Sequence, residues 1–176
     1  ILGWMPGGLA IVSIAACAFF TAFTGASGVT IIALGAILYP ALSQAGYDEK
    51  FNLGLVTAGG SLGLLFAPSL PLILSGVVAQ VNIDDLFVAG VLPGALMLFS
   101  LSFYSLWVNR GNRVPLSDFS WREVGSAIVD SIWELPLPIV VLGGIYSGLL
   151  AVSEAAAVTA VYVVLIEVVI RREISI

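Results

Sequence analysis

The most constraining feature of the sequence is an uncharged apolar segment, residues 9–42, that is too long for one membrane crossing. A transmembrane helix needs about 20 apolar residues. Small and hydroxylated residues interrupt the segment at 21–30, and each flank is too short for a full crossing but has a length typical of half-depth helices. We therefore expect a re-entrant helical hairpin. The alternative is one long tilted helix with a kink at a glycine.

A second apolar segment, residues 51–79, is also interrupted. It contains Gly59, Gly60 and Gly63, followed by Pro68 and Pro71. Glycine and proline both weaken a helix interior, so the pattern predicts a broken helix. In hydrocarbon, a break is tolerated only where protein or water covers the freed backbone groups. We expect this break to face the protein interior; the alternative is a kink that binds no ligand.

The remaining segments predict one full span and several shorter helices. Residues 86–108 form the cleanest span, and residues 120–134 have the amphipathic pattern of a helix lying on a membrane surface. A short apolar piece at 139–150 precedes a last helix at 153–170. We expect Glu154 to stabilise the start of that helix, because a carboxylate suits the positive helix end.

Composition defines the fold class and excludes several functions. The chain is 60% apolar and 10% charged, with a mean hydropathy of +1.11, whereas soluble domains carry about 25% charged residues. The chain is therefore expected to be an all-α membrane protein, a polytopic helical bundle. It has no histidine and one cysteine, which excludes imidazole-based catalysis, zinc clusters and intrachain disulfides. The net charge of −5, without a basic stripe, does not suggest a nucleic-acid partner. We expect no enzymatic activity and no cofactor.

The distribution of basic residues predicts the orientation. If the loop after residue 108 is cytoplasmic, every basic residue falls on the cytoplasmic side, as the positive-inside rule requires. The hairpin then enters and leaves the membrane from that side. Because the chain begins at Ile1 and ends at Ile176 without a natural-looking terminus, we also expect an internal fragment of a larger protein. The basic residues are Lys50, Arg110, Arg113, Arg122, Arg171 and Arg172.

The two interruptions predict an ion site. Half-helix N-termini favour anions, whereas C-terminal carbonyls and hydroxyl groups coordinate sodium. Thr24, Ser27 and Thr30 at the hairpin tip, with Ser61 and Ser69 at the break, offer hard oxygen ligands of the kind that suits Na⁺. Alternatively, these residues serve only membrane helix packing, where Gly, Ser and Thr are common.

An ordered set of motifs resembles the large membrane subunit of tripartite ATP-independent periplasmic (TRAP) transporters. The resemblance covers almost the whole chain and keeps the family's order. The motifs are Gly7-Gly8-Leu9 with residues 19–28, Gly46-Tyr47, residues 60–63, Pro68-Ser69-Leu70-Pro71, residues 89–94, Gly143-Gly144-Ile145 to Gly148, and Ser153-Glu154-Ala155-Ala156-Ala157 with Tyr162.

The resemblance implies a sodium-driven secondary transporter that imports organic acids, of the C4-dicarboxylate, keto acid or sugar acid class, by an elevator motion. It implies a periplasmic substrate-binding protein and a small membrane subunit as partners, in the cytoplasmic (inner) membrane of a bacterium or archaeon. Two alternatives remain: another elevator-type anion and sodium symporter that has no binding protein, and a membrane assembly subunit that transports nothing.

The resemblance also implies a division of the chain. Residues 1–80 belong to a transport domain, with the hairpin at 7–44 and the broken helix at 51–79. Residues 81–135 supply a scaffold span and an amphipathic surface arm, and residues 136–176 begin the following helices, with the second half of the site beyond the chain. The expected sodium ligands are Thr24, Gly25, Ser27, Gly60, Ser61 and Pro68, and the expected substrate contacts are Ser27, Gly28 and Ser69.

Overall fold

The structure is a computed structural model that describes residues 7–111, 122, 125, 126, 129, 132, 133, 136–166 and 168. Contacts divide the chain into two units, Ile1–Phe119 and Ser120–Ile176, and each is described by itself. Every regular element within the described residues is helical, which confirms the all-α class. Among the described residues, two helices are long and apolar enough to cross a membrane, α2 (Ser27–Gln44) and α5 (Ile83–Val108), and a bent helix pair provides a third candidate span.

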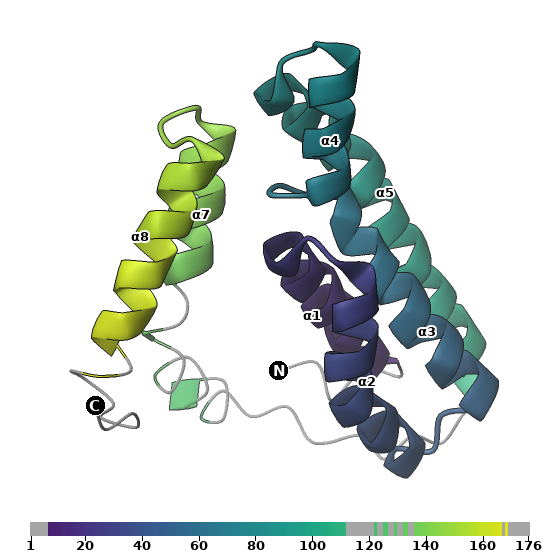
Figure 1. Cartoon of the computed structure of the whole chain (residues 1–176). Helices are drawn as coiled ribbons and strands as arrows, with labels where there is room; N and C mark the ends of the chain where they lie inside the picture. The colour runs from purple at the N-terminus through teal and green to yellow at the C-terminus, as the bar shows by residue number, and fades with distance from the viewer. Residues whose placement is uncertain are drawn as a thin grey trace. The chain divides into compact units, whose positions relative to one another are not determined.

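The first unit begins with the predicted helical hairpin. Helix α1 (Gly8–Thr24) ends where Gly25 adopts a left-handed conformation with φ of +66° and donates its N–H to Thr21 O at 2.7 Å. This conformation strongly favours glycine. Helix α2 (Ser27–Gln44) then runs back alongside α1 (Figure 1). One continuous helix is thereby excluded, although the two helices have 17 and 18 residues and are longer than expected.

The hairpin packs against helix α3 (Glu49–Leu62), and the core of the unit lies between these three helices. Gly46, with φ of +87°, ends α2, and Tyr47 N–H closes the turn by donating to Leu42 O at 3.1 Å. Asp48 then caps α3, because its carboxylate accepts the N–H groups of Lys50 and Phe51. The core residues are Ala10, Ile14, Leu42, Tyr47, Leu55 and Val56.

The predicted break in the second segment exists, but it lies later than expected. Helix α3 runs without interruption through Gly59 and Gly60, and a single 3-10 turn, Gly63–Leu65, follows it. The chain resumes as α4 (Leu70–Ala79), and the two parts are bent by 40°. The expectation that Gly59 and Gly60 themselves would interrupt the helix is therefore wrong. Gly59 instead packs against α1, and Gly60 packs against α2.

The hairpin tip lies at the level of this break. A Cβ atom placed on Gly25 would lie 3.0 Å from Leu70 Cγ, at the first residue of α4. Helix α4 therefore continues beyond the tip, as Figure 1 shows. At 1.5 Å per residue, the 18 residues of α2 span about 27 Å and the 26 residues of α5 about 39 Å. A hairpin that ends beside the middle of a broken span has the geometry expected of a re-entrant element.

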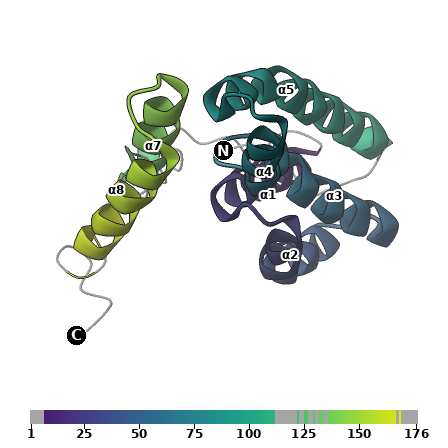
Figure 2. The ribbon, with the colours of Figure 1, turned by 45° about the horizontal axis from the view of Figure 1, so that its top comes forward.

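Helix α5 (Ile83–Val108) is the predicted full span, extended by three residues at its start. Asn82 caps it by accepting the Asp84 N–H at 3.1 Å. Helix α5 packs against α1 and α4, and Figure 2 shows α1 lying between α2 and α5. Much of its apolar surface is uncovered: Leu92 is 71% exposed and Phe99 70% exposed. Such a surface belongs in contact with lipid or with further membrane helices.

The second unit contains α7 (Pro136–Tyr146) and α8 (Val152–Val164), which pack against each other. Glu154 has the structural role expected of it, because its Oε2 accepts the Ala151 N–H at 3.0 Å at the start of α8. The surface helix predicted at 120–134 falls mainly outside the described residues. The division into transport and scaffold parts stays a prediction.

Gly63→Ala should lower the thermal unfolding midpoint of the full-length protein by several degrees. The added Cβ would collide with the Ala18 carbonyl oxygen and lie 2.5 Å from Thr21 Cβ. Overpacking of this kind costs about 1–3 kcal/mol. Gly54→Ala is the matched control, since no atom lies within 4 Å of its added Cβ and alanine favours a helix. Equal midpoints for the two variants would contradict the close packing of α1 on the break.

Candidate functional site

The candidate site is the contact between the hairpin tip and the break of the α3–α4 span. The tip reaches both sides of the break: Gly25 lies against Leu70 of α4, and the position of a Cβ on Gly60 of α3 is 3.5 Å from Ser27 O. The chain therefore brings together segments about 40 residues apart in sequence, as expected from the cost of leaving two separate interruptions uncovered in hydrocarbon.

A chain of hydroxyl groups joins the tip to α3. Thr21 Oγ1 lies 2.8 Å from Gly60 O and 2.7 Å from Thr30 Oγ1. A carbonyl oxygen can only accept, so the Thr21 proton goes to Gly60 O, and Thr30 donates its own proton to Thr21. Both threonine side chains are fully buried. The three groups thus satisfy one another and tie α1, α2 and α3 together.

Glycines make this approach possible. A Cβ on Gly59 would lie 3.1 Å from Cys17 Cβ, and one on Gly60 would lie 2.7 Å from Ile31 Cγ1. A larger residue at Gly60 would separate α3 from α2 and lengthen the bond from Thr21. The glycine pair, expected to break the helix, serves instead to admit the hairpin.

The ends of two helices meet at this contact. Helix α2 starts after Ala26 and helix α4 after Ser69, and neither start has a side-chain cap. The first N–H groups of a helix have no partner within it, and they form the positive end of the helix dipole. Ser69 Oγ is also fully buried and has no hydrogen-bond partner in the structure. Two helix N-termini and an unpaired hydroxyl therefore offer donors to an anionic group.

The structure places the expected ligand residues unevenly. Gly25 and Gly60 are buried at the contact, and Ser27 and Pro68 are partly buried. Gly28 is exposed, and no atom lies within 4 Å of the position of its Cβ.

Two expected hydroxyl groups take little part in the contact. Ser61 is exposed, and its hydroxyl donates to Thr57 O at 3.0 Å within its own helix. Thr24 is exposed as well, and its Oγ1 is 3.5 Å from both Thr21 O and Thr30 Oγ1, at the limit of hydrogen bonding. Their roles as ion or substrate ligands stay predictions.

Sequence reasoning missed the residues that hold the contact together. In the sequence, Thr21 is one of several small and hydroxylated residues at 21–30, and Gly63 is one of three glycines that weaken a helix. A signal existed, because Thr21 is four residues before Gly25 and therefore one helical turn below the tip. A hydroxyl group at that position can reach the helix against which the tip packs, which here is α3.

The contact is electrically neutral. Its residues are glycine, alanine, serine, threonine, proline and leucine, none of which titrates. Among the described residues, no cluster of histidine, cysteine or acidic side chains could hold a metal ion. Any ion bound here would be held by carbonyl and hydroxyl oxygens, an arrangement suited to a weakly held alkali cation rather than to a transition metal.

Helices broken at mid-membrane, with their ends directed at a shared polar contact, characterise membrane permeases of the secondary transporter type. The whole chain, residues 1–176, matches the family described as "Tripartite ATP-independent periplasmic transporter, DctM component". The chain belongs to this family, a family of transporter permeases and not of enzymes, and it is part of a multi-pass membrane protein.

Three curated relatives illustrate the similarity. The isethionate TRAP transporter permease protein of Oleidesulfovibrio alaskensis is 38% identical over 99% of this chain and 28% of its own length. The ectoine/5-hydroxyectoine TRAP transporter large permease of Ruegeria pomeroyi is 36% identical over 99% of this chain and 41% of its own length. The C4-dicarboxylate TRAP transporter large permease of Vibrio cholerae is 36% identical over 92% of this chain and 36% of its own length. The chain thus spans less than half the length of these relatives.

Thr21→Val should destabilise the full-length protein by about 1–3 kcal/mol, because it removes the buried hydrogen bonds that join Thr21 to Gly60 O and to Thr30 Oγ1. Reversible unfolding in mixed detergent micelles would measure the loss. Thr159→Val is the matched control, since Thr159 bonds only within its own helix, to Ala155 O at 2.8 Å. Thr21 and Thr30 share one hydrogen bond, so the double valine variant should lose less than the sum of the single losses, by about 0.5 kcal/mol or more. Additive losses would contradict the hydroxyl chain.

Proposed function

We propose that this chain supplies the first part of a sodium-coupled transport site for organic anions, in a permease of a bacterial or archaeal inner membrane. The observation that carries the proposal is the meeting of the hairpin tip with the break of the α3–α4 span. In the full-length protein, a periplasmic binding protein delivers the substrate and a small membrane subunit supports the permease. The lipid bilayer surrounds the exposed apolar face of α5.

The helix starts at the contact favour an anionic substrate. Helices α2 and α4 both begin there without side-chain caps, and Ser69 Oγ is buried without a partner. A carboxylate or sulfonate would accept hydrogen bonds from these groups and gain from both helix dipoles. The compounds named for the three relatives, isethionate, ectoines and C4-dicarboxylates, each carry such an acid group. Ser27, Gly28 and Ser69 are the proposed substrate contacts.

The carbonyl groups at the contact favour a sodium ion. Helix α1 ends at Thr24 and helix α3 at Leu62, so the C-terminal, carbonyl-rich ends of two helices lie in the same region as the two starts. Oxygen ligands without a net charge bind sodium weakly enough for release in each cycle. The proposed ligands are Thr24, Gly25, Ser27, Gly60, Ser61 and Pro68, with carbonyl oxygens contributing wherever hydroxyl groups are turned away.

The packing of the first unit supports movement of the hairpin and the broken span as one body. The Thr21 bond to Gly60 O fastens the tip to α3, and the shared core of α1, α2 and α3 fastens the rest. A transport domain that shifts as a rigid unit against its scaffold, as in an elevator motion, requires such internal connections.

Ser27→Ala should raise the sodium concentration needed for half-maximal uptake by several-fold, because it removes one oxygen ligand and leaves the backbone intact. The measurement is sodium-dependent uptake of a dicarboxylate or sulfonate by proteoliposomes containing the full-length permease, its small subunit and its binding protein. Ser100→Ala is the control, since Ser100 bonds only to Leu96 O within α5. An unchanged sodium dependence would remove the Ser27 hydroxyl from the site.

Ser69→Ala should weaken substrate binding by at least about tenfold, since a hydrogen bond to a charged group contributes about 1.5–3 kcal/mol. The stability of the substrate-free protein should not fall, because Ser69 Oγ makes no bond that the substitution would break. Binding and thermal unfolding would both be measured. Ser75→Ala is the control, because Ser75 is exposed on the same helix and bonds to Pro71 O. A loss of stability without a loss of affinity would assign Ser69 a purely structural role.

A further inference from the structure

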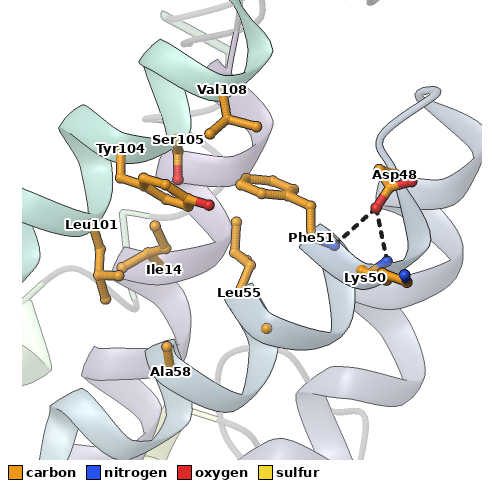
Figure 3. A pocket seen from close by; sticks show the side chains of 11 residues that line it. Ile14, Asp48, Lys50, Phe51, Leu55, Ala58, Leu101, Tyr104, Ser105 and Val108 are labelled. Atoms are coloured by element: carbon orange, nitrogen blue, oxygen red, sulfur yellow. Dashed lines mark hydrogen bonds between the residues drawn. The ribbon is translucent and has the colours of Figure 1, made fainter.

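A cavity of about 500 Å³ lies between α3 and α5, apart from the tip and the break (Figure 3). Its floor is Ile14 of α1, and its walls include Leu55 of α3 and Leu101 of α5. None of its lining residues belongs to the candidate transport site. The lining is mainly apolar, so the cavity suits a hydrocarbon group.

The cavity exists because α3 and α5 are both held by α1 rather than by each other. Gly59 brings α3 against Cys17 of α1, and α5 approaches the start of α1, where a Cβ on Gly7 would lie 3.3 Å from Ser105 O. Across the gap, the ring centres of Phe51 and Tyr104 are 6.5 Å apart. The two helices therefore leave an elongated groove with an aromatic pair on its sides.

The narrowness of the groove argues against a protein helix as its occupant. The ring centres of Phe51 and Tyr104, on its two sides, are 6.5 Å apart. A helix with its side chains is about 10–12 Å wide. An alkyl chain is much narrower and can follow a slot between two helices along its length.

One end of the groove carries a pair of opposite charges. Asp48 and Lys50 both line it, at the start of α3. Asp48 is fixed in place, because its Oδ2 accepts the Lys50 N–H at 3.0 Å and the Phe51 N–H at 3.4 Å. Within the part of the chain that the structure describes, no acidic group pairs with the Lys50 ammonium. One cation and one anion beside each other complement a zwitterionic headgroup better than a singly charged one.

The same end has the features of a membrane interface. Tyr104 lines the groove there, and Trp107, 65% exposed, lies one turn further along α5. Tyrosine and tryptophan concentrate at the level of lipid headgroups. The charges and aromatic residues therefore set the depth at which a lipid headgroup would lie, with the apolar groove extending from it toward the membrane interior.

We propose that the groove between α3 and α5 binds a phospholipid with an ammonium-bearing zwitterionic headgroup of the phosphatidylethanolamine type. One acyl chain lies between Leu55 and Leu101 over Ile14. The phosphate pairs with Lys50, and the ammonium group pairs with Asp48.

Gly54→Leu tests the acyl-chain site. Gly54 lines the groove, and no atom lies within 4 Å of the position of its Cβ, so a side chain added there starts in open space and takes up room in the groove. Native mass spectrometry of the full-length protein with added phosphatidylethanolamine should show at least a fivefold loss of bound lipid. Gly143→Leu is the matched control, because Gly143 is in α7 and also has open space at its Cβ position; it should retain the lipid. Equal retention by the two variants would overturn the proposal.

Lys50→Gln tests the headgroup. The wild-type protein should retain phosphatidylethanolamine several-fold better than phosphatidylglycerol, and Lys50→Gln should reduce this retention. Arg110→Gln removes a cation beyond the same end of α5 and should change neither value, because Arg110 does not line the groove. Equal retention of the two lipids by the wild-type protein would overturn the headgroup assignment.

A labelling experiment on the wild-type protein needs no variant. A phosphatidylethanolamine carrying a photoactivatable diazirine in one acyl chain should label the peptides that contain Leu55 and Leu101 in the full-length permease. Excess unlabelled phosphatidylethanolamine should suppress this labelling. Labelling confined to the outward surface of α5, with none at Leu55, would show that another part of the protein fills the groove and would overturn the proposal.

Discussion

The first unit depends on the need to pair every backbone polar group that is removed from water. Two of its segments leave the helical hydrogen-bond pattern, one at the hairpin tip and one after α3. Each covers the other: Thr21 donates to Gly60 O, and the tip lies against the first residue of α4. The glycines of α3 follow from the same need, because only residues without a side chain allow the helices to approach this closely. The proposed transport site and the stability of the unit therefore share one contact.

Much of this arrangement could be predicted from the sequence. The length of the first apolar segment, with small residues at its centre, required a chain reversal, and Gly25 provides it. The prolines after Gly63 required a break, and Glu154 lies at the start of α8, where helix-end chemistry predicts it. These features are local, so residue spacing and backbone preference determine them.

The features that the sequence did not predict depend on contacts between helices, which the spacing of residues along the chain does not determine. Glycine weakens an isolated helix, so Gly59 and Gly60 suggested an interruption, yet packing against α1 and α2 keeps the helix intact through both residues. Ser61 was expected at the contact because of its hydroxyl group, but its position on the helix turns it outward to Thr57 O. Thr21 emerged as the central donor only once the partner helix was known. Whether a hydroxyl group reaches the contact therefore depends on which face of its helix carries it.

The neutrality of the tip contact has a consequence for the proposed energy coupling. Cation sites built from carboxylates accept a proton as readily as a metal ion when the pH falls, so the driving ion can be replaced by acid. The tip and the break offer only carbonyl and hydroxyl oxygens, which take up no additional proton in the physiological range. A proton therefore finds no basic group at this contact. The oxygens that this chain contributes therefore discriminate against protons by their chemistry, without any need to exclude them by size.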